Sequence, residues 1–193
     1  MPDSLDSIRT DLFQRIEQGA RDRNSAMHTP AVATAEGDAR IMVLRDFDRD
    51  RALLRFHTDA RAPKVSAIET DRRVGVLFYD RDAKIQIRCR GQGRIEREGS
   101  VADAAWAQST NFARRCYLGA GPGEVATEPT SGLPARFEGV EPDDEALAPA
   151  RANFAVLLVE LTELDWFYLS NDGHRRARFD RVGEGWKGRW IAP

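Results

Sequence analysis

The sequence Arg40-Ile-Met-Val-Leu-Arg45, followed by Ala52-Leu-Leu-Arg-Phe-His-Thr58, decides the expected fold of this chain. Each stretch is a short apolar run, and the charged residues Asp46 to Asp50 separate the two. Apolar runs of this length on either side of a polar turn are typical of two strands joined as a β-hairpin. The sequence therefore predicts a hairpin over 40–58.

The rest of the chain continues this pattern of short strands with few helices between them. Pro63 stands where a first helical residue would fall, and Val65 and Ile68 follow at helical spacing, which predicts a helix over 63–70. Further helices are expected at 4–18, ending at Gly19, around Trp106 with Ser100 as cap, and at 141–152. Further strands are expected at 30–34, 74–79, 84–90 with a kink at Gly91 and Gly93 before 94–96, 154–161, 166–169, 175–180 and 186–191. Residues 119–132, rich in Gly, Pro, Thr and Ser, are expected to form a long loop.

This order of elements predicts a mainly β fold of the α+β class, an antiparallel barrel with peripheral helices. Strands and helices do not alternate one for one, so a doubly wound nucleotide-binding fold is disfavoured. The chain also lacks the glycine-rich phosphate-binding motifs of such folds. A length of 193 residues fits one domain with a sizeable core.

The composition of the chain argues against several classes of protein. The chain has 29 basic and 31 acidic residues, and this near balance argues against a general nucleic-acid binder. No apolar run approaches the roughly 18 residues that span a bilayer, and the charged N-terminus lacks the apolar core of a signal peptide, so we expect no membrane partner and a cytoplasmic location. The cysteines, Cys89 and Cys116, form no CxxC pair, and the three histidines lie far apart, so neither a disulfide framework nor a metal site is expected.

One basic segment has the chemistry of a phosphate site. Thr58, Arg61 and Lys64 place a hydroxyl and two cations where a strand runs into a helix start. Guanidinium, ammonium and free helical N–H groups are the donors that hold a phosphate monoester. The same residues are equally compatible with a solvated surface loop beside a helix cap.

Five motifs in a fixed order carry a resemblance to a known family. They are Arg40-x-x-Val-Leu-Arg45, then Phe56-x-Thr-x-x-Arg-x-x-Lys64, Val74-x-x-Leu-Phe78, Gln86-Ile-Arg-x-x-Gly91, and a terminal Trp166 with Arg176-x-Arg-Phe179 and Trp190. This order resembles the FMN-binding split barrel of the pyridoxamine 5'-phosphate oxidase family. The resemblance is good over about 28–98, returns over about 164–193 and is weak between them. It implies a six-stranded antiparallel split barrel with peripheral helices that forms a homodimer. The single domain over 1–193 would have an N-terminal helix in 1–25, the main barrel over 28–98 and C-terminal strands over 164–193.

The resemblance also implies which residues hold flavin mononucleotide (FMN). Arg45 stands where the family usually has a lysine that faces flavin and substrate, and Trp166 and Arg178 match residues that the second subunit contributes to the same FMN. The implied FMN-binding set is Arg40, Ile41, Met42, Val43, Leu44, Arg45, His57, Thr58, Arg61, Ala62, Lys64, Gln86, Trp166 and Arg178. Other roles stay open for several of them: Met42, Val43, Leu44 and Trp166 as core residues, Gln86 facing water, and Arg178 paired with Asp180 or Glu184.

The substrate side departs from the family. The family's Arg-x-His substrate unit is replaced by His174-Arg-Arg-Ala-Arg178, so Arg45, Arg175 and His174 are the substrate-side candidates and the catalytic residues stay unknown. Arg114, Arg115 and Tyr117 have suitable chemistry for a substrate anion but do not align with the family's spacing.

The resulting expectation is an FMN-dependent oxidoreductase that moves a hydride from a small, phosphorylated or carboxylated substrate to FMN. A non-enzymatic flavin carrier or sensor, a haem-handling split barrel, and a dimeric interaction domain without cofactor are the alternatives. Whether deazaflavin replaces FMN is open.

Overall fold

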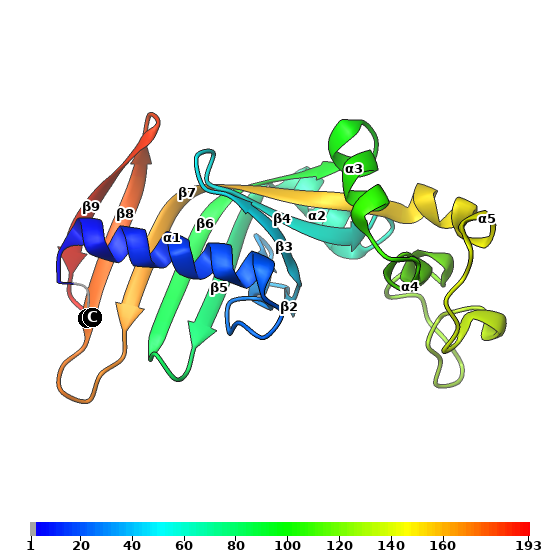
Figure 1. The fold of residues 1–193 in the computed structure, drawn as a ribbon, viewed down its shortest axis with the longest axis horizontal. Helices are drawn as coiled ribbons and strands as arrows, with labels where there is room; N and C mark the ends of the chain where they lie inside the picture. The colour runs from blue at the N-terminus through cyan, green and yellow to red at the C-terminus, as the bar shows by residue number, and fades with distance from the viewer. Residues whose placement is uncertain (1–2) are drawn as a thin grey trace.

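The computed structural model describes residues 3–193 as one continuous, strongly curled antiparallel sheet with helices on its outside (Figure 1). The strand order is β2-β1-β5-β6-β7-β4-β3, and β8 pairs with the C-terminal part of β7 and with β9. The mainly β, α+β expectation is confirmed, but the sheet has nine strands rather than six. The strands are β1 (Ala31–Thr34), β2 (Ala39–Ile41), β3 (Leu44–Asp48), β4 (Leu53–Asp59), β5 (Arg73–Asp80), β6 (Ile85–Glu96), β7 (Phe154–Tyr168), β8 (Arg175–Val182) and β9 (Gly185–Ile191).

The helices lie at the ends and on one face of this sheet. In Figure 1, α1 crosses the sheet from β9 to β3, while α3, α4 and α5 form a separate lobe at the far end of β7. The helices are α1 (Leu5–Arg21), α2 (Pro63–Thr70), α3 (Ser100–Gln108), α4 (Asn111–Arg114), α5 (Asp144–Leu147) and the short 3₁₀ helices η1 (Arg115–Leu118), η2 (Ala135–Phe137) and η3 (Ala148–Asn153). Within the described residues, no helix is long and apolar enough to span a bilayer.

The predicted strand at 40–45 is divided between two strands of the structure. Ala39–Ile41 is β2 and pairs with β1, whereas Leu44 begins β3 and pairs with β4. Met42 and Val43 lie between the two strands, and the backbone N–H of Met42 donates to the Pro30 carbonyl at 3.0 Å. The chain changes partner strand at this point, which a continuous apolar run does not reveal. The predicted hairpin is confirmed as β3–β4.

The two longest strands replace several shorter predicted ones. β7 contains both predicted strands 154–161 and 166–169, and β6 contains 84–90 and 94–96. The register between β6 and β7 shifts at Arg90/Gly91, so the predicted irregularity at Gly91 is confirmed. A Cβ on Gly91 would lie 2.3 Å from the Glu160 carbonyl oxygen, so only glycine allows this close approach.

The main core lies between α1 and the concave face of the sheet. The buried positions of α1 recur at helical spacing (Ile8, Leu12, Ile16) and belong to the same buried cluster as Trp166 and Phe179. Gly19 was predicted to end this helix, but the helix continues to Arg21. A Cβ at position 19 would lie 2.7 Å from Met27, so glycine is needed there for close packing. The remaining helices agree with expectation at 63–70 and around Trp106, whereas 141–152 forms only the short helices α5 and η3. Ser100 is the first residue of α3, whose N-cap is Gly99. Residues 119–132 contain no helix or strand, as expected.

Candidate functional site

A cavity of about 350 Å³ opens where the β2–β3 junction, the end of β4 and the start of α2 meet the segment around η1. Its lining comes from three parts of the chain that the fold brings together. The lining residues are Arg40, Ile41, Met42, Val43, Arg45, His57, Thr58, Asp59, Lys64, Cys116, Tyr117 and Pro122. Eight of the predicted cofactor residues therefore share one cavity.

Three cations face this cavity, and two of them lack a carboxylate partner. Arg40 pairs with Asp38 and also approaches the Val32 carbonyl. Neither Arg45 nor Lys64 makes an ion pair or a side-chain hydrogen bond with any residue of 3–193. Burial and then the nearby Arg40 charge lower the pKa of Lys64. Crowded, incompletely neutralised positive charge of this kind favours a bound anion.

Arg61, which the resemblance assigns to FMN, does not line the cavity. Its guanidinium donates from Nε to Asp59 Oδ1 at 3.0 Å and from Nη2 to Asp59 Oδ2 at 2.7 Å. Its Nη1 donates to the Gly119 carbonyl at 3.0 Å. Arg61 thus neutralises the one carboxylate that lines the cavity and fixes the start of the 119–132 loop beside it.

His57 is neutral at physiological pH. Burial, then the charges of Arg45 and Arg55, lower its pKa to about 4. Its Nε2 is buried and has no hydrogen-bond partner among the described residues, and its ring lies edge-on to Phe154 at 5.0 Å. A neutral imidazole beside unpaired cations can accept or donate one hydrogen bond without adding charge.

Tyr117 and its neighbours form one wall of this cavity. The sequence marked Tyr117 as a candidate for binding a substrate anion, but its spacing did not align with that of the family. Tyr117 packs against Phe154 at 5.1 Å and Trp106 at 6.1 Å, and its carbonyl accepts a hydrogen bond from Asn153 Nδ2 at 2.8 Å. Cys116 and Pro122 also line the cavity and were not predicted. They lie in the part of the chain where the resemblance is weak, and no motif marks them.

The other two arginines of this region are structural. Arg114 donates to the Trp106 and Ala107 carbonyls at 2.9 and 3.0 Å, and Arg115 donates to the Phe137 and Val140 carbonyls at 2.9 and 3.1 Å. Both guanidinium groups therefore hold the fold of this lobe together. Tyr117 alone of the three substrate-side candidates in 106–117 lines the cavity.

The remaining predicted residues lie outside the cavity. Leu44 and Ala62 are buried, so their side chains serve packing. Gln86 lies on β6 on the face that also carries Arg88, opposite the buried Ile85 and Ile87. His174 and Arg175 are exposed at the turn before β8, where the His174 ring contacts the edge of Phe167 at 5.5 Å.

Trp166 and Arg178 lie on opposite faces of the β7–β8 pair. Trp166 is completely buried in the core, and its indole N–H has no partner among the described residues. The indole is thus a core side chain in this structure, and the assignment of Trp166 to the partner's FMN stays a prediction. Arg178 lies on the open face, where it pairs with Glu163 at 2.5 Å and with Asp180 at 3.1 Å.

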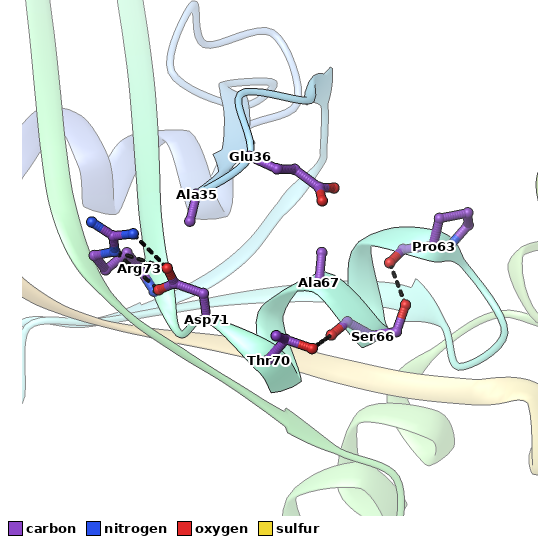
Figure 2. Close-up of a pocket in the computed structure, with 8 residues that line it drawn as sticks. All are labelled: Ala35, Glu36, Pro63, Ser66, Ala67, Thr70, Asp71 and Arg73. Carbon is purple, nitrogen blue, oxygen red and sulfur yellow. Dashed lines mark hydrogen bonds and ion pairs between the residues drawn. The ribbon is translucent and has the colours of Figure 1, made fainter.

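A larger cavity, of about 550 Å³, lies on the neighbouring flank of α2 (Figure 2). Figure 2 shows α2 facing the turn that carries Ala35 and Glu36, with Arg73 bound to Asp71 at its edge. Arg73 is its only lining cation among the described residues, and Asp71 neutralises it. This cavity therefore lacks the donors that an anionic cofactor needs.

The cavity with the unpaired cations lies mostly within a recognised domain. Residues 8–97 match the family described as "Pyridoxamine 5'-phosphate oxidase, FMN-binding domain". Over these residues the chain is similar to the FMN-binding domain of that family. The predicted resemblance and the FMN cofactor are thereby confirmed, and the donors fit FMN: cations without partners for its phosphate, and a hydroxyl at Thr58. Cys116, Tyr117 and Pro122 lie beyond the matched residues.

Solved structures share the fold of this chain over its whole length. A pyridoxamine 5'-phosphate oxidase-related, FMN binding protein from Nostoc punctiforme aligns with a TM-score of 0.75 and 23% identity, covering 100% of both chains. PhzG from Burkholderia lata, in complex with tetrahydrophenazine-1-carboxylic acid, aligns with a TM-score of 0.65 and 21% identity, covering 100% of this chain and 94% of PhzG. No curated protein sequence matches the chain significantly.

Proposed function

We propose that this chain is an FMN-dependent oxidoreductase that works as a homodimer and takes a hydride from a small anionic substrate. The observation that carries the proposal is the cavity in which Arg45 and Lys64 have no carboxylate partner within residues 3–193. We further propose that the whole chain, 1–193, acts as one domain of this type.

The FMN phosphate is assigned to the α2 end of the cavity. Lys64 lies in the first turn of α2 and Thr58 near the end of β4, so an ammonium, a hydroxyl and the N–H groups of a helix start converge there. Arg40 adds a third donor from β2. When bound, FMN supplies the redox chemistry by accepting a hydride at N5 and passing electrons to dioxygen or another acceptor.

The open face of the sheet is the proposed site of the second copy. One cross-strand row runs from Ile41 through Ala31 and Leu77 to Arg88, Asp165 and Arg178. Ile41, Leu77 and the nearby Tyr79 expose 66%, 40% and 50% of their surface, which is unusual for large apolar side chains that lie together. Ile41 also lines the cavity that contains Arg45 and Lys64, which we call the flavin cavity. A partner on this face would therefore reach that cavity. An apolar half and a charged half on one face suit a two-fold interface, in which Arg178 of one copy lies near the flavin of the other.

The opposite end of the cavity is assigned to the substrate. Arg45, His57 and Tyr117 lie there, and Arg45 is the single unpaired cation, because Arg114 and Arg115 are held by carbonyl groups. One guanidinium, one neutral imidazole and one phenol favour a monoanionic ring compound over a phosphate dianion. PhzG, which shares the fold, was solved with a ring compound that carries one carboxylic acid.

Titration of the purified chain with FMN, followed by quenching of flavin fluorescence, tests the proposal. We expect Lys64→Ala to weaken FMN binding by about tenfold or more, since a charge-assisted hydrogen bond is worth about 1.5–3 kcal/mol. Lys187→Ala, an exposed lysine on β9, is the matched control and should bind as the wild type does. Absence of FMN binding by the wild type, or unchanged binding by Lys64→Ala, contradicts the proposal.

Turnover separates an enzyme from a flavin carrier. Anaerobic mixing of the FMN-loaded protein with a dihydroaromatic carboxylate should bleach the flavin absorption, and pyridoxamine 5'-phosphate should react more slowly or not at all. FMN binding without reduction by any donor would favour the carrier. We also propose a cytoplasmic location, because both Cys89 and Cys116 are free thiols.

A further inference from the structure

A second basic cavity lies at the end of the β3–β4 hairpin that is remote from the flavin cavity. Its volume is about 630 Å³, and it lies between α1, the β3–β4 turn and the β8–β9 turn. In Figure 1 these two turns project beyond the same edge of the sheet, and β4 and β8 both pair with the edge of β7 that β6 leaves open. The flavin cavity contacts the opposite ends of β3 and β4, at Arg45 and His57.

Two arginines tie the walls of this cavity together. Arg181 Nη1 donates to the Arg51 carbonyl at 2.8 Å and approaches Glu160 Oε1 at 3.3 Å. Arg9 Nη1 donates to the Trp186 carbonyl at 3.4 Å, and its Nη2 pairs with Asp6 at 3.1 Å. Segments more than 100 residues apart are thereby fixed around one hollow.

The other two arginines of the lining are poorly neutralised. The Arg49 guanidinium lies over the Phe13 ring at 5.3 Å, and its one carboxylate contact, with Glu17, is at 4.0 Å. Arg51 is exposed and makes no ion pair within residues 3–193. The only acidic lining residues in the described chain are Asp50 and Glu184, so four guanidinium groups face two carboxylates.

An aromatic surface completes the cavity. Trp186 is half-buried and meets Phe13 edge-on, with ring centroids 6.1 Å apart. Guanidinium groups bind phosphate oxygens bidentately, and an indole beside them offers a flat ring a stacking surface. We propose that this cavity is a second ligand site, which binds a phosphate ester carried on a flat ring. It shares no residue with the flavin cavity, and the inference does not depend on the proposed function.

Calorimetric titration with phenyl phosphate tests this proposal. The test pair is Arg49→Gln together with Arg51→Gln, which removes the two poorly neutralised charges and keeps most of the side-chain volume. The matched control is Arg23→Gln together with Arg81→Gln, two exposed arginines outside the cavity. Circular dichroism and thermal unfolding establish that both double variants are folded.

We expect phenyl phosphate to bind the wild type in a salt-sensitive manner and the Arg49/Arg51 variant at least about tenfold more weakly. In protein loaded with one equivalent of FMN, so that the flavin cavity is filled, binding should be unchanged in the Arg23/Arg81 control. Loss of binding once the flavin cavity is filled, or unchanged binding in the Arg49/Arg51 variant, would overturn the proposal, as would equal loss in the control. Equal affinity for phenyl phosphate and inorganic phosphate would overturn the part assigned to Trp186.

Discussion

The guanidinium of Arg61 holds the carboxylate of Asp59 through two parallel hydrogen bonds, Nε to Oδ1 at 3.0 Å and Nη2 to Oδ2 at 2.7 Å. The backbone N–H of Arg61 adds a third bond to Oδ1 at 2.8 Å. Asp59 lines the flavin cavity and is nearly buried, so its charge would repel an anionic cofactor if it were left alone. We therefore expect Arg61 to act on the site through Asp59 rather than by touching phosphate.

This relationship predicts that Arg61 affects the affinity for FMN only while Asp59 is charged. Arg61→Ala should weaken FMN binding by about tenfold, because it exposes a buried carboxylate to the phosphate. Asp59→Asn combined with Arg61→Ala should restore most of the affinity. FMN titration of the two single variants and the double variant completes a thermodynamic cycle. Equal losses in Arg61→Ala and in the double variant would instead indicate direct contact between Arg61 and the phosphate.

His57 predicts a pH dependence of stability. Its pKa is about 4 in the folded chain and 6.5 when exposed, so the unfolded chain binds the extra proton between these values. Stability is therefore complete above about pH 6.5 and is lost as the pH falls toward 4, by about 2 kcal/mol at pH 5. Urea unfolding at pH 7 and pH 5 measures the loss, and His57→Gln should remove that part of it. An identical pH dependence in the two proteins would show that His57 is not held neutral by the fold.

The close approach of Gly91 to the β7 backbone predicts that no side chain is tolerated at position 91. Gly91→Ala places a Cβ 2.3 Å from the Glu160 carbonyl oxygen, so β6 and β7 must separate, at a cost of about 2–4 kcal/mol. Gly185→Ala is the control, because its nearest contact is the Val182 carbonyl oxygen at 3.8 Å. Thermal unfolding should show a lower Tm for Gly91→Ala alone. A wild-type Tm for that variant would mean that the bulge between β6 and β7 adjusts freely.

The position of Arg178 on the open face of the sheet predicts that it contributes to FMN binding by the second copy of the proposed dimer. Light scattering should give the mass of two chains, and Arg178→Ala should weaken FMN binding by about tenfold without dissociating the dimer. Arg189→Ala is the matched control, since Arg189 pairs with the same Asp180, at 2.6 Å, from the neighbouring strand β9. A monomer that binds FMN with full affinity, or equal effects of the two substitutions, would contradict a site shared between subunits.

Much of the fold and part of the site could be predicted from local sequence. The α2 helix was placed at 63–70 because Pro63, Val65 and Ile68 are local signals, and the structure has it at those residues. The β3–β4 hairpin, the 119–132 loop and the cavity residues from Arg40 to Lys64 were found for the same reason: they lie close together in sequence, in motifs with fixed spacing.

What local sequence could not show were relations between distant segments. The apolar pattern of 40–45 looks continuous, yet β2 and β3 pair with different strands, and only tertiary pairing divides it. Trp166 shares the apolar character of any interface residue, and only the packing of α1 onto the sheet places it in the core.

The sequence by itself therefore predicted a β-rich fold, the resemblance to the oxidase family, and the cations and hydroxyl that gather in residues 40–64. The tertiary structure alone decided which cations remain free. Arg61, Arg114 and Arg115 look equivalent to Lys64 and Arg45 in the sequence, but hydrogen bonds to Asp59 and to backbone carbonyls hold all three. Charge is a property of a residue, whereas its availability depends on partners that folding brings from elsewhere in the chain.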